Sequence, residues 1–355
     1  MFTGKLNSNA IFSGIYNMII SQQVFADNIK GTHSKLVDAA RTDGGLYGDT
    51  KLYYATDALK SAPWGKDAEA LNLLALHRPE SPKCQAITLD QFRQISLTVD
   101  NYLTKQAWAT ESAFSEFNSV MLGWIRDTKR VYDSTLYNAY IGTVEGEAAQ
   151  ATREIAVSDV VGNAEGEEAA KLEAMAIAQG LADLFVEMGD VSRDFNDYGF
   201  LRSYDMSDLK VVWNSKVVNK IRKVDLPTIF HKEGLVDKFE EYVLPSRYFG
   251  FIKTESGVST GIERTLVEKD LSNGKHVFPG DILPTGEAYE ANEAYEVDED
   301  IICKVFVKLP PYMSAFEVGT SFFNPKSLTE NHYLTWGYNT LEYLKNYPVI
   351  TVHKD

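Results

Sequence analysis

Residues 108–142 read WATESAFSEFNSVMLGWIRDTKRVYDSTLYNAYIG and contain no proline. Apolar side chains recur in this stretch at steps of three or four residues or small multiples of these, which predicts one face of an α-helix. The predicted apolar face consists of Phe114, Phe117, Met121, Trp124, Val131 and Ala139. The predicted opposite face is polar and carries Glu116, Ser119, Arg126, Lys129, Arg130 and Asp133.

We predict that this stretch is one continuous helix from about residue 112 to about residue 141, longer than any other in the chain. Thr110 or Ser112 can cap its start, Gly123 lies inside it, and Gly142 can end it. Such a helix is a rod of roughly 45 Å, whereas helices in compact domains average about 11–12 residues. It indicates either a long core helix of a large α+β protein or the spine of a flat, extended subunit.

The residues before this helix indicate an arm followed by a long two-stranded excursion. Residues 1–48 contain one amphipathic helical pattern and then a glycine-rich break, and we interpret them as an N-terminal arm. Residues 49–105 begin and end with β-rich runs, which an extended β-arm and an ordinary hairpin with a helical insert explain equally well. We expect the excursion to pack on a neighbouring subunit, because its apolar residues have little local sequence to bury them. These residues are Leu52, Tyr54, Trp64, Leu71 and Leu74.

The residues after the helix predict a series of shorter helices and strands. A regular apolar stripe predicts a second strong helix at 166–188, and its outward acidic face is interpreted as solvated. We predict strands at 153–161, 209–213, 300–309 and 349–352, and a short helix at 216–223. Residues 321–347 are rich in aromatic side chains and are interpreted as mainly loop.

Composition narrows the possible functions. The chain has 355 residues, of which 44% are hydrophobic, and only two cysteines, which suits a reducing compartment. No apolar run reaches the roughly 18 residues that a membrane helix needs. The net charge of −15 is concentrated in 145–200, with 13 acidic and 3 basic groups, and in 281–300, with 8 acidic and no basic groups. An acidic chain without a basic stripe is poorly suited to binding duplex DNA, because that affinity comes mainly from neutralising phosphates.

A search for chemistry finds one catalytic motif. The histidines and cysteines lack metal-ligand spacing, there is no phosphate loop, and we expect neither cofactor nor metal. Residues Gly257-Val258-Ser259-Thr260-Gly261 match the nucleophile motif G-x-S-x-G of serine hydrolases. Asp281 or Asp298, followed by His332 or His353, would complete a catalytic triad in the required chain order. The default interpretation of 257–261 is a β-turn loop, and the default for the acidic residues at 287–300 is a solvated or weakly cation-binding loop.

The order of arm, excursion, long helix, acidic helical region and returning strands resembles the major capsid proteins of tailed bacteriophages, which have the Hong Kong 97 fold. The resemblance is carried by ISLTVDNYLTKQAWATESAFSEFNSVMLGWIRDTKRVYDSTLYNAYIG at 95–142, where a returning strand runs into the spine helix. It is also carried by DLKVVWNSKVVNKIRKVD at 208–225, which looks like the strand and helix of the axial domain of that family.

The resemblance implies an α+β subunit divided into segments with separate structural roles. These are an N-terminal arm at 1–48, an extended β-loop at 49–105, the spine helix of a peripheral domain at 106–150, a mainly axial domain at 151–300, and strands returning to the peripheral domain at 301–355. Many copies would form the hexamers and pentamers of an icosahedral shell in the virion, assembled in the host cytoplasm around double-stranded DNA. The implied partners are the chain itself, a separate scaffold protein and a portal protein. Cellular nanocompartment shells share the fold, and a soluble hydrolase using Ser259 is the competing class.

Two further expectations concern maturation and charge. Because the chain begins at Met1 and only about 48 residues precede the excursion, we expect no N-terminal scaffolding segment to be removed. We expect the acidic segments to line capsomer centres or particle surfaces rather than to hold the genome. Assembly should then improve with added salt, because charges more than about 8 Å apart are screened at physiological ionic strength.

Overall fold

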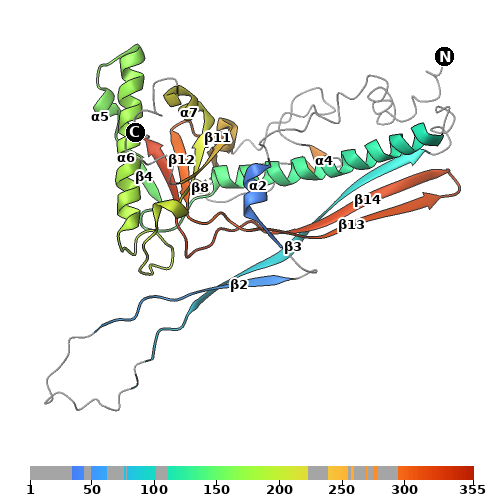
Figure 1. Ribbon diagram of the computed structural model, residues 1–355, viewed down its shortest axis with the longest axis horizontal. Coiled ribbons are helices and arrows are strands. Elements are labelled where there is room, and N and C mark those ends of the chain that lie inside the picture. Colours follow the sequence, from blue (N-terminus) through green and yellow to red (C-terminus); the bar gives the residue numbers. More distant parts are fainter. Residues whose placement is uncertain are drawn as a thin grey trace. The chain divides into compact units, whose positions relative to one another are not determined.

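The computed structural model describes residues 34–43, 49–61, 76, 78–100, 111–222, 239–254, 257–259, 269–270, 276–277 and 295–355. The chain divides into two compact units (Figure 1). Unit 1 comprises Met1–Thr50, Ile87–Asn138 and Pro311–Leu341, and unit 2 comprises Lys51–Ala86, Ala139–Pro310 and Glu342–Asp355. The expected N-terminal arm lies mostly outside the described residues, and the expected returning segment at 301–355 is divided between both units.

The long helix is confirmed. Helix α4 runs without interruption over Glu111–Thr143, 33 residues, and Gly123 does not break it. It is longer than the next helix among the described residues, α6 at Gly166–Gly189, which has 24. Its residues up to Asn138 belong to unit 1, and its last residues belong to unit 2.

Unit 1 is built on long antiparallel strands that lie beside α4 (Figure 1). The strand order of its sheet is β1-β13-β14-β3-β2, and β1 runs parallel to β13. Helix α2, Lys35–Ala40, buries three apolar side chains in this unit. The strands are β1 Arg41–Asp43, β2 Thr50–Ala55, β3 Lys83–Asp100, β13 Tyr312–Asn324 and β14 Thr329–Asn339.

The hairpin of β13 and β14 corrects the prediction that 321–347 is mainly loop. Its strands pair from Ser314 opposite Tyr338 to Asn324 opposite Thr329, with one irregularity between Ala315 and Val318. In the outer half of β13 every residue at 317–323 is exposed, and in the outer half of β14 every residue at 329–333 is half-buried, so no alternation of buried and exposed positions marks these strands. Hydrogen bonding between these two long strands stabilises the hairpin where a buried apolar face normally would. Such pairing leaves no apolar periodicity in the sequence, so the pattern of residues does not predict the strands.

Unit 2 contains a mixed five-stranded sheet in the order β4-β15-β12-β5-β6. Helix α6 lies along this sheet (Figure 1) and buries the predicted stripe, including Ile177, Leu181 and Met188, among the apolar residues of the strands. The helix and strand predictions for 166–188, 209–213, 300–309 and 349–352 are confirmed to within a few residues. The strands are β4 Thr152–Ile155, β5 Lys210–Asn214, β6 Glu240–Leu244, β12 Ile301–Phe306 and β15 Val349–Lys354.

The rest of unit 2 consists of short elements. The predicted strand at 153–161 is only half right, because β4 ends at Ile155 and helix α5, Val157–Val161, follows. The predicted short helix is α7, Ser215–Arg222. A three-stranded antiparallel sheet has the order β11-β7-β8, and β9 pairs with β10. These strands are β7 Gly250–Thr254, β8 Gly257–Ser259, β9 Lys269–Asp270, β10 His276–Val277 and β11 Tyr295–Val297, and 3₁₀ turns lie at Met206–Asp208 and Ser246–Tyr248.

Gly142 does not cap α4 as predicted but lies inside its last turn. A Cβ at this position would lie 1.9 Å from the carbonyl oxygen of Tyr248, so the backbones touch and no side chain fits. In α6, a Cβ at Gly180 would lie 2.9 Å from a side-chain carbon of Ile155. Each helix therefore uses a glycine to approach its neighbour within unit 2.

Candidate assembly surfaces

The contact between α4 and the β13–β14 hairpin contains buried charges. The side chains of Lys129 and Asp133 are only 8% and 1% exposed, and Lys129 Nζ lies 3.4 Å from Asp133 Oδ2 and 3.1 Å from Glu317 Oε2. The hydroxyl of Tyr312 donates a hydrogen bond of 2.6 Å to Asp133 Oδ1. Burial raises the pKa of Asp133, against the lowering influence of Lys129 and Tyr312. The prediction that Lys129 and Asp133 lie on an outward polar face is therefore wrong.

Aromatic side chains of α4 and of the hairpin pack in the same contact as the ion pair. The ring of Tyr132 meets Trp336 edge-on at 5.7 Å between centroids, and its hydroxyl lies 2.7 Å from that of Tyr338. Tyr312 stacks on Tyr338 at 6.0 Å. Because these rings and the ion pair share one contact, α4 is held on the hairpin by packing and charge together.

The face of α4 that this chain buries differs from the predicted apolar stripe. The buried positions include Ile125, Tyr132, Leu136 and Tyr140, at spacings of seven, four and four. Trp124 is 40% exposed and Val131 is half-buried, so these two stripe residues lie away from the core of their own chain. The side chains of the other three proposed packing residues, Phe114, Phe117 and Met121, lie outside the described part. Packing of the helix through these three residues stays a prediction.

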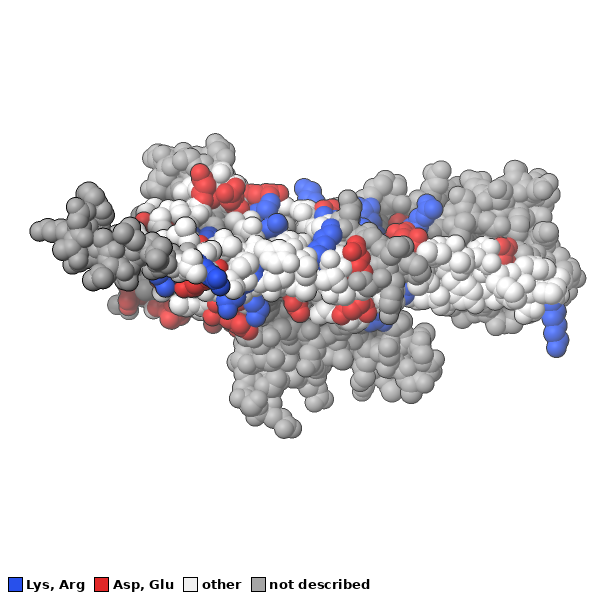
Figure 2. All heavy atoms as spheres, turned by 90° about the horizontal axis from the view of Figure 1, so that it is seen from below, with Lys and Arg blue, Asp and Glu red and all other residues white. Residues whose placement is uncertain are grey.

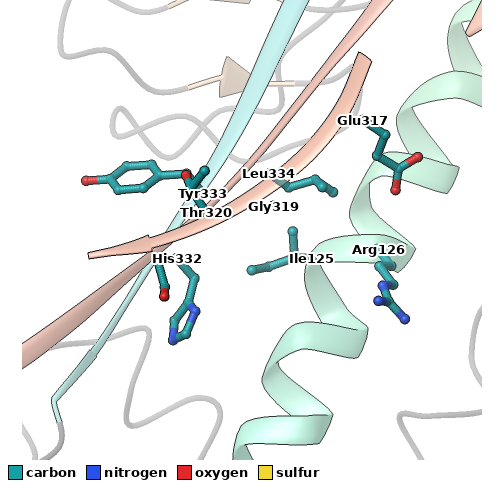
Figure 3. A pocket seen from close by; sticks show the side chains of 9 residues that line it. Ile125, Arg126, Glu317, Gly319, Thr320, His332, Tyr333 and Leu334 are labelled. Atoms are coloured by element: carbon teal, nitrogen blue, oxygen red, sulfur yellow. The ribbon is translucent and has the colours of Figure 1, made fainter. Parts of the chain in front are cut away.

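A groove lies between α4 and the outer part of the hairpin (Figure 3). Its volume is about 540 Å³. Ile125 and Leu334 line the groove with apolar surface, and the side chain of His332 lies on the same side of the hairpin as Ile125. The lining residues are Ile125, Arg126, Glu317, Gly319, Thr320, Ser321, His332, Tyr333 and Leu334. The two charged residues that line the groove, Arg126 and Glu317, are exposed at its rim. The lining residues therefore form no cluster of catalytic groups.

The excursion exposes apolar side chains at positions for which the sequence predicted an inter-subunit contact. Leu52 and Tyr54 are 52% and 65% exposed. Leu59 and Leu76, which the sequence analysis did not single out, are 80% and 81% exposed. The other residues proposed for this contact, Trp64, Leu71 and Leu74, lie outside the described residues. Large apolar side chains that water covers in the single chain mark a surface suited to a partner.

The base of the excursion is fixed to its own unit. Asp57 accepts hydrogen bonds from Arg193 Nη1 at 2.6 Å and from the backbone N–H of Leu201 at 2.9 Å. These donors lower the pKa of Asp57 to about 2, so the carboxylate is charged at neutral pH. Arg202 Nη2 donates to the carbonyl of Thr56 at 2.7 Å. The exposed leucines therefore follow an anchored base rather than a loose chain.

The structure does not support the hydrolase alternative. Ser259 ends β8, opposite Ile252 in an antiparallel pair, whereas a nucleophile elbow follows a strand of a mainly parallel sheet. Asp298 Oδ2 lies 3.7 Å from Nδ1 of His353, and burial lowers the pKa of that histidine. Asp298 precedes β12, and His353 lies in β15. The other candidate histidine, His332, lies in unit 1, where its Nε2 is 3.9 Å from Glu330 Oε1. Asp281 and the side chain of Ser259 lie outside the described residues.

The described residues contain no cluster of three or more His, Cys, Asp or Glu side chains suited to a metal ion. Within the same residues, no helix has the length and apolarity of a membrane span. At the end of the acidic segment 287–300, Glu299 pairs with Lys216, and Asp300 lies 3.5 Å from Lys354. These carboxylates are paired with lysines of the chain itself, which leaves less charge to attract a free cation.

Charges of both signs are mixed over the described surface. Figure 2 shows acidic and basic side chains interspersed on the face it draws, with no continuous basic field among the residues it colours. Within the acidic segment, Arg153 forms two hydrogen bonds to Glu187, at 3.0 and 3.2 Å. The residues coloured on this face form no basic stripe of the kind that typically binds duplex DNA.

Comparison of the fold with known proteins identifies clear relatives in structure. No family model and no curated protein matches the sequence. A chain in the capsid structure of Staphylococcus phage Andhra is similar with a TM-score of 0.59 and 12% identity, over 89% of this chain and 83% of that one. A chain in the structure of the head fiber and inner core protein gp22 of native bacteriophage P68 is similar with a TM-score of 0.56 and 10% identity, over 88% and 83%. At this identity the likeness lies in the fold, and the chain has a phage capsid fold.

Proposed function

We propose that this chain is the major capsid protein of a tailed phage and has the Hong Kong 97 fold. The observation that carries the proposal is the similarity to the Andhra capsid chain over 89% of this chain and 83% of that one. The continuous helix α4 and the anchored excursion with exposed leucines support it, because both match the layout that the resemblance implies. In this role Asp57 and α4 position surfaces, and no residue performs catalysis.

The proposed activity is self-assembly into hexamers and pentamers of an icosahedral shell that encloses double-stranded DNA without reading its sequence. The shell would be the capsid of a virion, assembled in the host cytoplasm with a separate scaffold and a portal protein. The excursion of each copy would pack its apolar side chains on a neighbour. The acidic segments would lie at capsomer centres or particle surfaces, and assembly would improve as salt screens them.

Electron microscopy of the purified chain tests this proposal. The expected result is closed particles or capsomers, in a yield that increases with salt or divalent cations. A monomer or small oligomer under all conditions, including co-expression with a scaffold from the same genome, would contradict it. Particles that contain protein cargo rather than DNA in the producing cell would favour the nanocompartment shell of the same fold. Duplex binding that weakens steeply with salt would reveal a phosphate-binding surface outside the described residues.

A further inference from the structure

Three adjacent rows of residues on one face of the sheet in unit 1 contain no charged side chain, and the next row outward ends at Asp100. The registers of β3, β14 and β13 place residues side by side in three rows across the sheet. The rows are Gln94–Thr335–Val318, Ser96–Tyr333–Thr320 and Thr98–Asn331–Phe322. We call these residues the uncharged face. Residues directly opposite one another in a ladder point to the same side, so the rows form one surface.

The uncharged face points away from α4. In Figure 3, Tyr333 and Thr320 lie on one side of the hairpin, and Ile125 and His332 lie on the other. Phe322 is 61% exposed and Val318 is 38% exposed, so the described part of the chain does not cover this surface. Figure 2 shows a mainly white field toward the hairpin end of that view, with red within it and blue at its edge.

Two side-chain hydrogen bonds stiffen this face. Gln94 Nε2 donates to Thr335 Oγ1 at 2.9 Å, and Thr98 Oγ1 donates to Asn331 Oδ1 at 2.6 Å. Both bonds join β3 to β14 across the rows. Side chains that are already paired lose less rotational freedom when a partner binds, which lowers the entropy cost of a contact.

Charge indicates which partner this face suits. Each copy of the chain carries a net charge of −15, so two copies repel each other over most of their surfaces. A face without charge avoids this repulsion and also avoids desolvating a charge when it is covered. Exposed Phe322 and Val318 add apolar area that covering would remove from water. A nucleic acid or another polyanion would find no cation among the residues of these rows.

We propose that the uncharged face is a contact surface for a second copy of this chain. The inference rests on the proposed shell function and assigns one of its contacts to a named surface. Its nine residues are fewer than the roughly 20–30 residues a side of a typical stable interface. It therefore acts as one of several weak contacts that add up in a closed lattice.

Charge substitutions of both signs test the proposal. Thr320→Glu and Thr320→Lys place a charge in the middle row, and Ser96→Lys does so from another strand. Ser207→Glu and Ser207→Lys are matched controls at an exposed position outside the acidic segments. We measure the subunit concentration needed for particle formation, and the thermal unfolding of unassembled subunits as a check of folding.

The three variants on the uncharged face are expected to unfold like wild type and to need at least about tenfold more protein to assemble, which corresponds to 1.4 kcal/mol. Thr320→Lys is decisive, because it lowers the net negative charge and would help assembly if overall repulsion alone mattered. Normal assembly of the folded variants would overturn the inference, as would equal defects in the Ser207 controls. If wild type itself forms no particles, the proposed function fails first, and the two failures are distinguished.

Discussion

Helices α4 and α6 are held in place by different physical means. Helix α6 buries a mainly apolar stripe against the sheet of unit 2, including Leu181 and Met188. One acidic residue of the predicted solvated face, Glu173, is also buried. In unit 1, α4 buries an ion pair between Lys129 and Asp133 together with aromatic rings. A stripe like that of α6 is visible in the sequence, whereas the buried side of α4 looks like a solvent face until the hairpin is present.

These two kinds of burial predict different responses of stability to pH and to the removal of a side chain. Apolar burial tolerates changes of pH and is weakened in proportion to the volume removed. A buried ion pair is only weakly stabilising as a whole, but breaking it leaves an uncompensated charge in the interior. Variants that remove one side chain at a time therefore separate the two kinds of contact.

The largest effect is expected for Gly142→Ala at the end of α4. The new methyl group would lie 1.9 Å from the Tyr248 carbonyl oxygen, so backbone must move, and we expect a loss of roughly 3 kcal/mol or more. In Gly180→Ala the obstruction is the side chain of Ile155, which can shift, and the loss should be smaller. Gly123→Ala is the matched control, since nothing lies within 4 Å of its Cβ, and alanine should stabilise this helix by about 0.5–1 kcal/mol. Urea unfolding measures all three, and equal stability of the Gly142 and Gly123 variants would disprove the close approach.

The next largest effect is expected for Lys129→Met. It leaves Asp133 charged and buried, which should lower the free energy of unfolding by about 3 kcal/mol at neutral pH. Burial already raises the pKa of Asp133, so the folded state takes up a proton more readily than the unfolded state. Acidification toward about pH 4 therefore favours the folded state at this residue, and the defect should shrink as pH falls.

Two further variants show whether the charge is responsible. Lys129→Met combined with Asp133→Asn should be more stable than Lys129→Met alone, because no charge remains unpaired. Leu181→Ala in α6 should cost about 2–5 kcal/mol with little dependence on pH in the same range. A pH-independent defect in Lys129→Met would show that packing, rather than charge, decides this contact.

The sequence predicts the elements whose burial is apolar and continuous. The stripe of α6 and the run of β12 both enter the core of unit 2, and their predicted bounds agree closely with the structure. It also predicts the length of α4, because helix propensity persists through Gly123. The sequence does not predict which side of α4 is buried, because Lys129 and Asp133 are stabilised by Glu317 and Tyr312, almost two hundred residues away.

The candidate surfaces show the same division. The exposure of Leu52 and Tyr54 agrees with the predicted contact of the excursion, since apolar residues in a polar stretch are visible in the sequence. The uncharged face was missed because its rows combine residues from three strands, and only the registers of β3, β14 and β13 bring them together. An alternation of Thr, Asn and Tyr at 329–335 was the available signal, but it was interpreted as loop.

A smaller effect on stability is expected at Lys304, the buried cation of unit 2. Lys304 is fully buried in β12 and donates a hydrogen bond to the carbonyl of Val144, and burial lowers its pKa to about 8. Unlike Lys129, it has no carboxylate within 4.0 Å among the described residues. Between pH 8 and the ordinary pKa of 10.5, the unfolded chain keeps the proton and the folded chain has released it, so stability should rise with pH.

Lys304→Met tests this expectation. Removing the buried charge relieves about 3 kcal/mol at pH 7, while leaving the Val144 carbonyl without its donor costs about 1–3 kcal/mol. The two changes nearly cancel, so the pH profile is the informative measurement. The difference between wild type and variant should change in favour of wild type from pH 8 to 10.5. A constant difference across this range would show that Lys304 keeps its proton in the folded protein as it does in the unfolded chain, so that burial does not lower its pKa.

The smallest effect on stability is expected in the excursion, where neither kind of burial operates within the chain. Leu59→Asp and Leu76→Asp replace side chains that are 80% and 81% exposed, so the free energy of unfolding should change by less than about 0.5 kcal/mol. If a neighbouring copy covers these leucines, each variant places a carboxylate in an apolar contact and should prevent particle formation. Ser207→Asp is the control, since Ser207 is exposed, lies outside the acidic segments and gains the same charge when replaced. Normal particles from both leucine variants would show that the exposed apolar residues of the excursion remain in water in the assembled protein.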